Sequence, residues 1–210
     1  MTRAALGFRM HSGWGVLVAV SADANRVEVL GRMRIVVIDP EIDGAVQPYH
    51  YAASIGPGNQ GRAKLSLLEA EKHIGKCASA SERLARAEIE EVVGKLEARQ
   101  YRIIGSAVLL ASGRALPPLA KILSAHPLIH TAEGEFFRNV VRQACERLKI
   151  PVTAIPEREL EDRAKTAFGN AAAKVQREIA SLGSLIGPPW TKDHKAATLA
   201  AAILLAKRTR

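Results

Sequence analysis

The chain has 210 residues, of which 48% are hydrophobic and 24% are charged. This composition is typical of a globular protein with a substantial core, and it excludes a disordered chain. The net charge of +9 favours partners that carry phosphate. Eight of these nine charges come from residues 100–210, which hold seventeen basic and nine acidic side chains.

The two cysteines, Cys77 and Cys145, occur among apolar residues in helical stretches. That setting is typical of reduced cysteines in a core, so we expect a cytosolic protein without disulfides. No signal peptide is visible at the start of the sequence. The longest apolar stretch, residues 196–206, is too short to span a bilayer, so we expect a buried helix and no membrane partner.

The first forty residues predict a three-stranded antiparallel meander. Strands are expected over residues 4–10, 14–21 and 26–39, with turns at His11-Ser12-Gly13 and at residues 22–25. The connection over residues 40–61 is rich in Pro and Gly, and we expect it to be irregular.

A long helix is predicted over residues 62–100, with an apolar stripe along its second half. Gly75 and Gly94 weaken this helix and are compatible with a break near Ala78–Ser81. If the stripe were exposed, the helix would suit a scaffold or regulatory subunit.

The remaining segments alternate between strand and helix. The apolar run 101–111 predicts a strand buried on both faces, and Thr131 is expected to cap a helix that leads to a short strand over 151–155. Strand, helix and strand in this order form a parallel unit. A helical insertion over 156–186 and an alanine-rich helix from Thr191 complete a single domain, residues 1–210.

The predicted fold is therefore α/β. Its mixed five-stranded sheet has three antiparallel strands followed by a parallel βαβ unit, with helices on both faces. This order resembles the plan of the ribonuclease-H-like superfamily, and most closely that of its Holliday-junction-resolvase branch. The segment Ala5-Leu6-Gly7-Phe8-Arg9 resembles the first strand of those nucleases, in which an Asp follows an apolar-Gly-apolar sequence. The segment Asp193–Ala200 resembles their closing helix.

The resemblance implies two divalent metals held by carboxylates from the first strand, the fourth strand and the last helix. This sequence departs from that pattern. Arg9 stands at the first-strand position, no acid occurs from Tyr101 through Ala132, and Asp193 is the acid near the closing helix. We therefore expect no two-metal nuclease, no bound metal and no other cofactor.

The carboxyl ends of the first and fourth strands, beside the start of the last helix, are where open α/β sheets bind ligands. A guanidinium, hydroxyls and backbone N–H groups gathered there would suit a phosphate. The candidate ligand-binding residues are Arg9, Ser12, Gly13, Ser112, Gly113 and His194. The alternative interpretation is that the Ser-Gly pairs serve only as turns and that Arg9 is a charge at the edge of the strand. Trp14 and Trp190 are better explained as core residues than as a surface for stacking bases.

Other residues suggest an enzyme or a metal site. Candidate catalytic residues for a hydrolase or phosphotransferase are His11, Ser112, His130, Glu133 and Asp193, with Arg9 beside them. The first set of possible metal ligands is His126, His130, Glu133 and Glu135, although Pro127 argues against a regular helix there. A second set is Asp39, Glu41 and Asp43, which are better explained as a solvated loop.

From these patterns we predict a ribonuclease-H-like protein that does not cleave nucleic acid. We expect it to bind nucleic acid, a nucleotide or another phosphate-bearing ligand through the strand ends and the basic C-terminal half. An enzyme with a different site, and a scaffold acting through residues 62–100, remain the alternatives.

Overall fold

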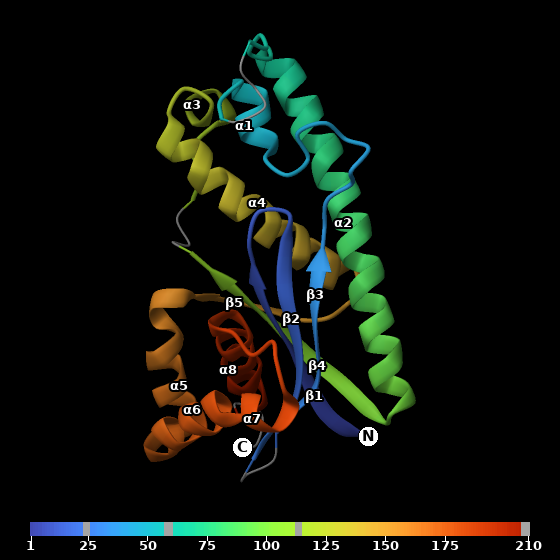
Figure 1. Ribbon diagram of the computed structural model, residues 1–210, viewed down its shortest axis with the longest axis vertical. Coiled ribbons are helices and arrows are strands. Elements are labelled where there is room, and N and C mark those ends of the chain that lie inside the picture. The colour runs from blue at the N-terminus through green and yellow to red at the C-terminus, as the bar shows by residue number, and fades with distance from the viewer. Residues whose placement is uncertain (23–25, 57–60, 112–114, 207–210) are drawn as a thin grey trace.

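Three N-terminal strands form the antiparallel half of the sheet in the computed structural model, which describes residues 1–22, 26–56, 61–111 and 115–206 (Figure 1). These strands are β1 (Thr2–Met10), β2 (Trp14–Ala22) and β3 (Val27–Val36). β2 pairs antiparallel with both β1 and β3. Gly13 closes the β1–β2 turn at φ +79, a conformation that residues with a side chain rarely adopt. The predicted meander is confirmed.

The second half of the sheet is parallel. Strand β4 (Tyr101–Leu110) pairs with β1, and β5 (Val152–Pro156) pairs with β4, which gives the order β3-β2-β1-β4-β5. The predicted fold class is therefore confirmed. Because β1, β4 and β5 are parallel, their carboxyl ends meet at one edge of the sheet.

One face of the sheet is covered by α2 (Leu67–Ala98) and α4 (His126–Arg147), with the short helices α1 (Pro48–Ala53) and α3 (Leu119–Ile122) beyond the sheet (Figure 1). Helix α2 begins with a capping box in which Ser66 and Glu69 bind each other's backbone N–H groups. It is continuous, so the possible break near Ala78–Ser81 does not occur. Its apolar stripe packs into the core, with Ala85, Ile89 and Leu96 buried.

Helix α4 begins at His126, five residues before the predicted cap at Thr131. The prediction was wrong because Pro127 was treated as a helix breaker. Proline in the first turn costs no hydrogen bond, since the first N–H groups of a helix have no partner within the helix. The hydroxyl of Thr131 instead donates to the carbonyl oxygen of Pro127 at 2.9 Å.

The other face carries α8 (Lys192–Ala206), which lies against β1, β2 and β4 and is flanked by α5 (Leu160–Phe168) and α6 (Ala172–Ser181). The segment between β5 and α8 consists of the short elements η1 (Glu157–Glu159), α5 (Leu160–Phe168), η2 (Gly169–Ala171), α6 (Ala172–Ser181) and α7 (Gly183–Ile186). Helix α8 approaches β1 so closely that a Cβ atom on Gly7 would overlap the carbonyl oxygen of Ala197.

Among the residues that the structure describes, no helix is both long enough and apolar enough to cross a membrane.

The packing of α8 on β1 predicts that Gly7→Ala destabilises the protein by roughly 3 kcal/mol, because overpacking forces backbone to move. Urea unfolding followed by circular dichroism would measure the effect. Gly31→Ala in β3 is the matched control, since no atom lies within 4 Å of its added Cβ. Equal stability of the two variants would contradict the close approach of α8.

Candidate ligand site at the strand ends

Arg9, near the carboxyl end of β1, binds two carboxylates from distant parts of the chain. Its Nε and Nη2 atoms donate to the two carboxylate oxygens of Glu157, at 3.1 and 2.9 Å. Its Nη1 donates to Oδ1 of Asp193. The Arg9 side chain is only 18% exposed, so its charge is partly shielded from water and matched by two anions. We call Arg9, His11, Glu157 and Asp193 the strand-end site.

The fold brings these residues together from three elements. Arg9 lies two residues after Gly7 and therefore on the same face of β1, toward α8. Glu157 directly follows β5, whose carboxyl end shares the edge with that of β1. Asp193 lies in the first turn of α8, where the helix N-terminus stabilises an acid.

Asp193 also contacts His11, whose Nε2 lies 2.9 Å from Oδ2. Burial raises the pKa of Asp193, but the hydrogen bonds from His11 and Arg9 outweigh burial and leave its pKa below the usual value. Asp193 is therefore ionised at neutral pH. The hydrogen bond to Glu157 raises the pKa of Arg9 against the opposing effect of burial.

A pocket of about 610 Å³ adjoins the site on the α8 side of β2 and β3. Its lining residues are Trp14, Val16, Arg32, Met33, Arg34, Pro189, Thr191, Asp193 and His194. The ring of Trp14 stacks on His11 with 4.5 Å between centroids, and the guanidinium of Arg34 lies 4.3 Å from the Trp14 ring. The pocket therefore combines an aromatic surface with two arginines.

The two arginines of the pocket differ in their partners. Nη2 of Arg32 donates to the backbone carbonyls of Ile186 and Gly187 at 2.9 and 3.0 Å, so Arg32 holds the segment before α8. Arg34 is exposed and has no ion-pair partner in residues 1–22, 26–56, 61–111 and 115–206. Arg34 is thus available to a ligand.

His194, which lines the pocket, is buried and accepts a hydrogen bond from the Thr191 backbone N–H at 3.3 Å. Burial lowers the pKa of His194, and the positive charge of Arg32 lowers it further. His194 is therefore neutral at physiological pH and contributes a polar surface without a charge.

Arg138 of α4 is a further buried cation near this edge of the sheet. Its Nε donates to the carbonyl oxygen of Leu109, near the end of β4, at 3.1 Å. Burial lowers the pKa of Arg138, whereas the charges of Glu135 and Glu157 raise it.

The structure brings together several of the predicted ligand-binding and catalytic residues. Arg9, His11 and Asp193 are in direct contact, and His194 lies in the adjoining pocket. Ser12 and Gly13 form the β1–β2 turn, directly after His11. Ser112 and Gly113 lie outside the described residues. Whether these groups bind phosphate stays a prediction.

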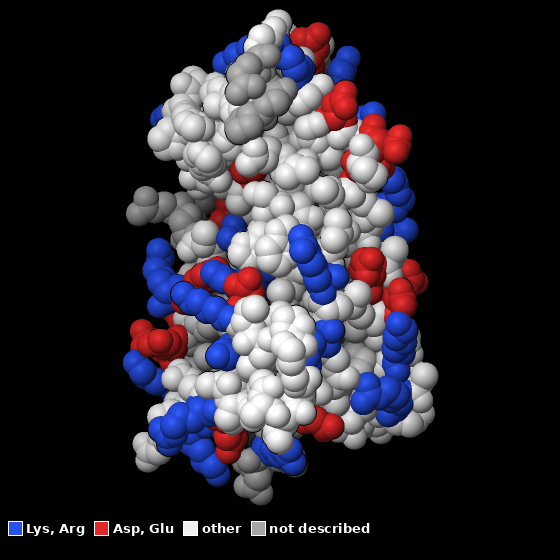
Figure 2. Space-filling model, in the orientation of Figure 1, with Lys and Arg blue, Asp and Glu red and all other residues white. Residues whose placement is uncertain are grey.

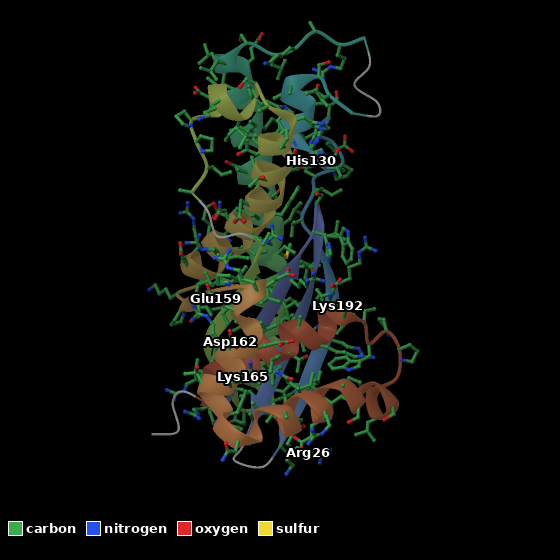
Figure 3. All side chains as sticks on the ribbon, turned by 90° about the vertical axis from the view of Figure 1, so that its left-hand side faces the viewer. Arg26, His130, Glu159, Asp162, Lys165 and Lys192 are labelled. Carbon is green, nitrogen blue, oxygen red and sulfur yellow. The ribbon has the colours of Figure 1, made fainter. Side chains whose placement is uncertain are left out.

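The catalytic candidates His130 and Glu133 do not join this site. Glu133 is buried and accepts a hydrogen bond from the backbone N–H of His50 at 3.2 Å. Burial raises the pKa of Glu133 to about 8, against the effect of the backbone hydrogen bonds from His50 and Tyr49. Figure 3 places His130 well away from Lys192, the first residue of α8, so a single cleft with Asp193 is not formed.

The other proposed metal ligands are also distributed differently. Asp39 pairs with Arg83 at 3.3 Å and accepts a hydrogen bond from the backbone of Glu41, which agrees with a solvated loop. Glu135 is buried at 8% exposure and lies apart from the histidines of α4. His126 and His130, in contrast, do come together.

Sequence reasoning missed Glu157 and the pocket-lining residue Arg34. The signal for Glu157 was present, because an acid directly after a parallel strand lies at the same edge as the other strand ends. The position of Arg34 could be predicted only with the register of β2 against β3, because that register places Arg34 opposite Val16. Trp14 and Trp190 do pack against the core as interpreted, but Trp14 also lines the pocket.

The sheet order, with helices on both faces, defines a ribonuclease-H-like fold. No protein-family model and no curated protein matches the chain. Solved structures that match include the Thermus thermophilus RuvC structure, at 13% identity and a TM-score of 0.49, covering 98% of this chain and 97% of that chain. Another is T. thermophilus RuvC in complex with Holliday junction substrate, at 13% identity and a TM-score of 0.50, covering 99% and 97%. The predicted resemblance to resolvases is thus confirmed for the fold.

The ion pairs of Asp193 predict a pH-dependent contribution to stability. Because its folded pKa lies below the usual 3.8, the contribution is present above pH 3.8 and is lost as the pH falls through the folded pKa. We expect Asp193→Asn to lower the free energy of unfolding by roughly 1–3 kcal/mol at pH 6, and by less at pH 3, which lies below the usual pKa.

Urea unfolding at both pH values would measure this difference. Asp162→Asn is the control, since Asp162 is 78% exposed and pairs only with Lys165 at 2.9 Å among the described residues. An Asp193→Asn effect that is equal at the two pH values would contradict the role of the charge.

Proposed function

We propose that this chain is a ribonuclease-H-like protein that binds nucleic acid without cleaving it. The observation that carries the proposal is the guanidinium of Arg9, which pairs with both Glu157 and Asp193 at the strand ends. The resemblance to resolvases implies metal-binding carboxylates in this region. In this chain, the carboxylates of Glu157 and Asp193 are paired with the guanidinium of Arg9 instead.

The strand-end residues do not fit a pair of divalent metals. Two-metal cleavage needs carboxylates that converge on ions about 4 Å apart. A guanidinium is always charged, and it binds carboxylates through two parallel hydrogen bonds. To bind an ion, Glu157 and Asp193 would have to break their hydrogen bonds with Arg9. The positive charge of Arg9 would then be partly buried, unpaired and next to a divalent cation. Metal-dependent cleavage at this site is therefore not expected.

The adjoining pocket has the chemistry to bind a nucleotide unit. Arg34 offers an exposed guanidinium to phosphate, and Trp14, which also contacts Arg34 and His11, contributes apolar surface to the pocket wall. The volume of about 610 Å³ is within the range of pockets that hold small ligands. We expect a phosphate and its attached base to enter between β3 and the start of α8.

Charge on the C-terminal half supports a longer contact with nucleic acid. Figure 2 shows Lys and Arg side chains gathered with some acids over the region where α5 and α6 lie in Figure 1. A protein with this fold, T. thermophilus RuvC, has been solved in complex with Holliday junction substrate. Branched DNA is therefore the first substrate class to test for binding.

The first experiment is a binding series by fluorescence anisotropy with duplex, four-way-junction and single-stranded DNA and with RNA. We expect binding at low salt that weakens steeply as salt rises, because phosphate contacts release counterions. For three contacts the affinity falls about fortyfold between 50 and 200 mM salt. Absence of binding to every probe at 50 mM salt would overturn the proposal.

Arg34→Gln is expected to weaken binding and to reduce the slope of log affinity against log salt by about 1, since one phosphate contact is lost. The control is Arg86→Gln on the exposed side of α2, which removes the same charge far from the pocket. An equal loss of affinity in both variants would show that binding depends on the net charge of the protein, and the pocket would then not be the binding site.

Arg9→Asp tests the role of the internal cation. We expect the variant to be less stable than the wild type without metal, because three carboxylates then face one another, and to recover stability with Mg²⁺, which prefers oxygen ligands. Melting temperatures with and without Mg²⁺ would measure this, with Arg9→Gln as the control that removes the cation without adding an acid. Mg²⁺-dependent cleavage of junction DNA by the wild type would contradict the non-nucleolytic assignment.

A further inference from the structure

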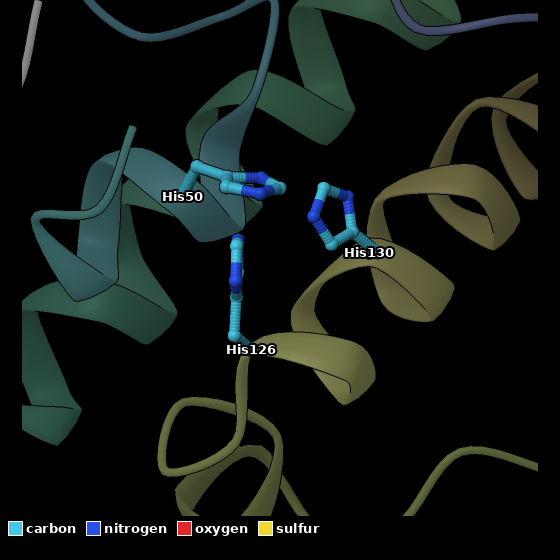
Figure 4. Close-up of side chains that lie close together, drawn as sticks. All are labelled: His50, His126 and His130. Carbon is cyan, nitrogen blue, oxygen red and sulfur yellow. The ribbon is translucent and has the colours of Figure 1, made fainter. Parts of the chain in front are cut away.

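Three histidines from two helices converge at the end of the molecule where α1 and α4 meet. His50 comes from α1, and His126 and His130 come from α4 (Figure 4). One ligand atom from each lies within 4.8 Å of the others. The ring centroids are 4.4 Å apart for His126 and His130, and 4.7 Å apart for His50 and His130. We call these residues the three-histidine cluster.

The local sequence builds half of the cluster. His126 and His130 are four residues apart in one helix, so their side chains lie on the same face. Pro127 fits between them because it occupies the first turn. Both histidines are exposed, so their rings can rotate toward a common ion without disturbing the core.

A tertiary contact supplies and orients the third histidine. His50 and Glu133 are each 3% exposed, and Nδ1 of His50 lies 2.9 Å from Oε2 of Glu133. The same oxygen accepts hydrogen bonds from the backbone N–H groups of Tyr49 and His50, each at 3.2 Å. When Glu133 is ionised, Oε2 can only accept hydrogen bonds, so Nδ1 of His50 donates to it. The lone pair of His50 is then on Nε2.

The contact between His50 and Glu133 is of the kind usual for histidine ligands of metals. Such histidines donate their other N–H to a carboxylate or carbonyl, which fixes the ring and its tautomer. Imidazole nitrogens suit zinc and similar transition metals. At a Zn–N distance of about 2.0–2.1 Å, two tetrahedral ligands lie roughly 3.4 Å apart, a spacing that small ring rotations from the present positions would reach.

We propose that His50, His126 and His130 bind one Zn²⁺ ion, with Glu133 orienting His50. The exposed rings of His126 and His130 leave a fourth position open to water. The ion would join α1, which lies in the connection before α2, to the first turn of α4. This site is separate from the strand-end site and does not depend on the proposed nucleic-acid binding (Figure 3).

The proposal is tested by calorimetric titration of the full chain, without a histidine tag, with ZnCl₂. We expect one ion to bind per chain and the melting temperature to rise as zinc is added. In a parallel titration, Co²⁺ is expected to give the visible absorption of a nitrogen-ligated ion. Absence of zinc binding would overturn the proposal.

Paired variants locate the site. His126→Ala combined with His130→Ala is expected to abolish binding, and because both residues are exposed the fold should be retained. The control is His73→Gln on α2. Nε2 of His73 lies 3.6 Å from Sγ of Cys77, so these two residues are another possible pair of zinc ligands. Zinc binding that survives the double variant, or that is lost in His73→Gln, would overturn the assignment.

Glu133→Gln tests the orienting contact separately. The amide oxygen can still accept the backbone hydrogen bonds, but it holds His50 less strongly. We expect zinc affinity to fall about 10- to 100-fold, the range seen when a residue that orients a metal ligand is replaced. Unchanged affinity would overturn the orienting role of Glu133.

Discussion

Helix α8 lies directly against β1 because Gly7 has no side chain, which lets the backbone of Ala197 approach it closely. This close approach sets the position of the first turn of α8 over the carboxyl end of β1. Asp193 therefore reaches Arg9, and His194 lines the adjoining pocket. The antiparallel pairing of β2 with β1 and β3 then brings Trp14 and Arg34 to the same place. The site at the strand ends is thus a consequence of how tightly one helix packs on one strand.

An arginine at this position changes what the fold can do. A metal ion can exchange its ligands and can polarise a bound phosphate. The guanidinium of Arg9 is instead fixed to the chain and satisfies Glu157 and Asp193 through directed hydrogen bonds. It stabilises the association of β1, β5 and α8 while keeping the carboxylates occupied. Arg34, two strands away in register and exposed, is the cation that we propose contacts phosphate.

The two candidate sites differ in how far the sequence alone could predict them. The strand-end location followed from the element order, since parallel strands end at one edge, and Arg9, His11 and Asp193 were predicted to gather there. The pair His126 and His130 was recognised from its spacing, but Pro127 was wrongly taken to argue against the helix. Glu133 is one of the possible metal ligands in the sequence, whereas in the structure its carboxylate contacts His50. His50 could not be found, because 76 residues separate it from His126 and only α1 packing on α4 joins them.

The sequence by itself determined the strands, most of the helices and the parallel connection, because these depend on local periodicity, turn residues and the spacing of apolar side chains. It also determined that no acid follows β4 within the segment from Tyr101 through Ala132. Only the tertiary structure decided that Glu157 shares Arg9 with Asp193, and that His50 faces His126 and His130. Such contacts depend on register and on the approach of elements distant in sequence, and no local pattern encodes those distances.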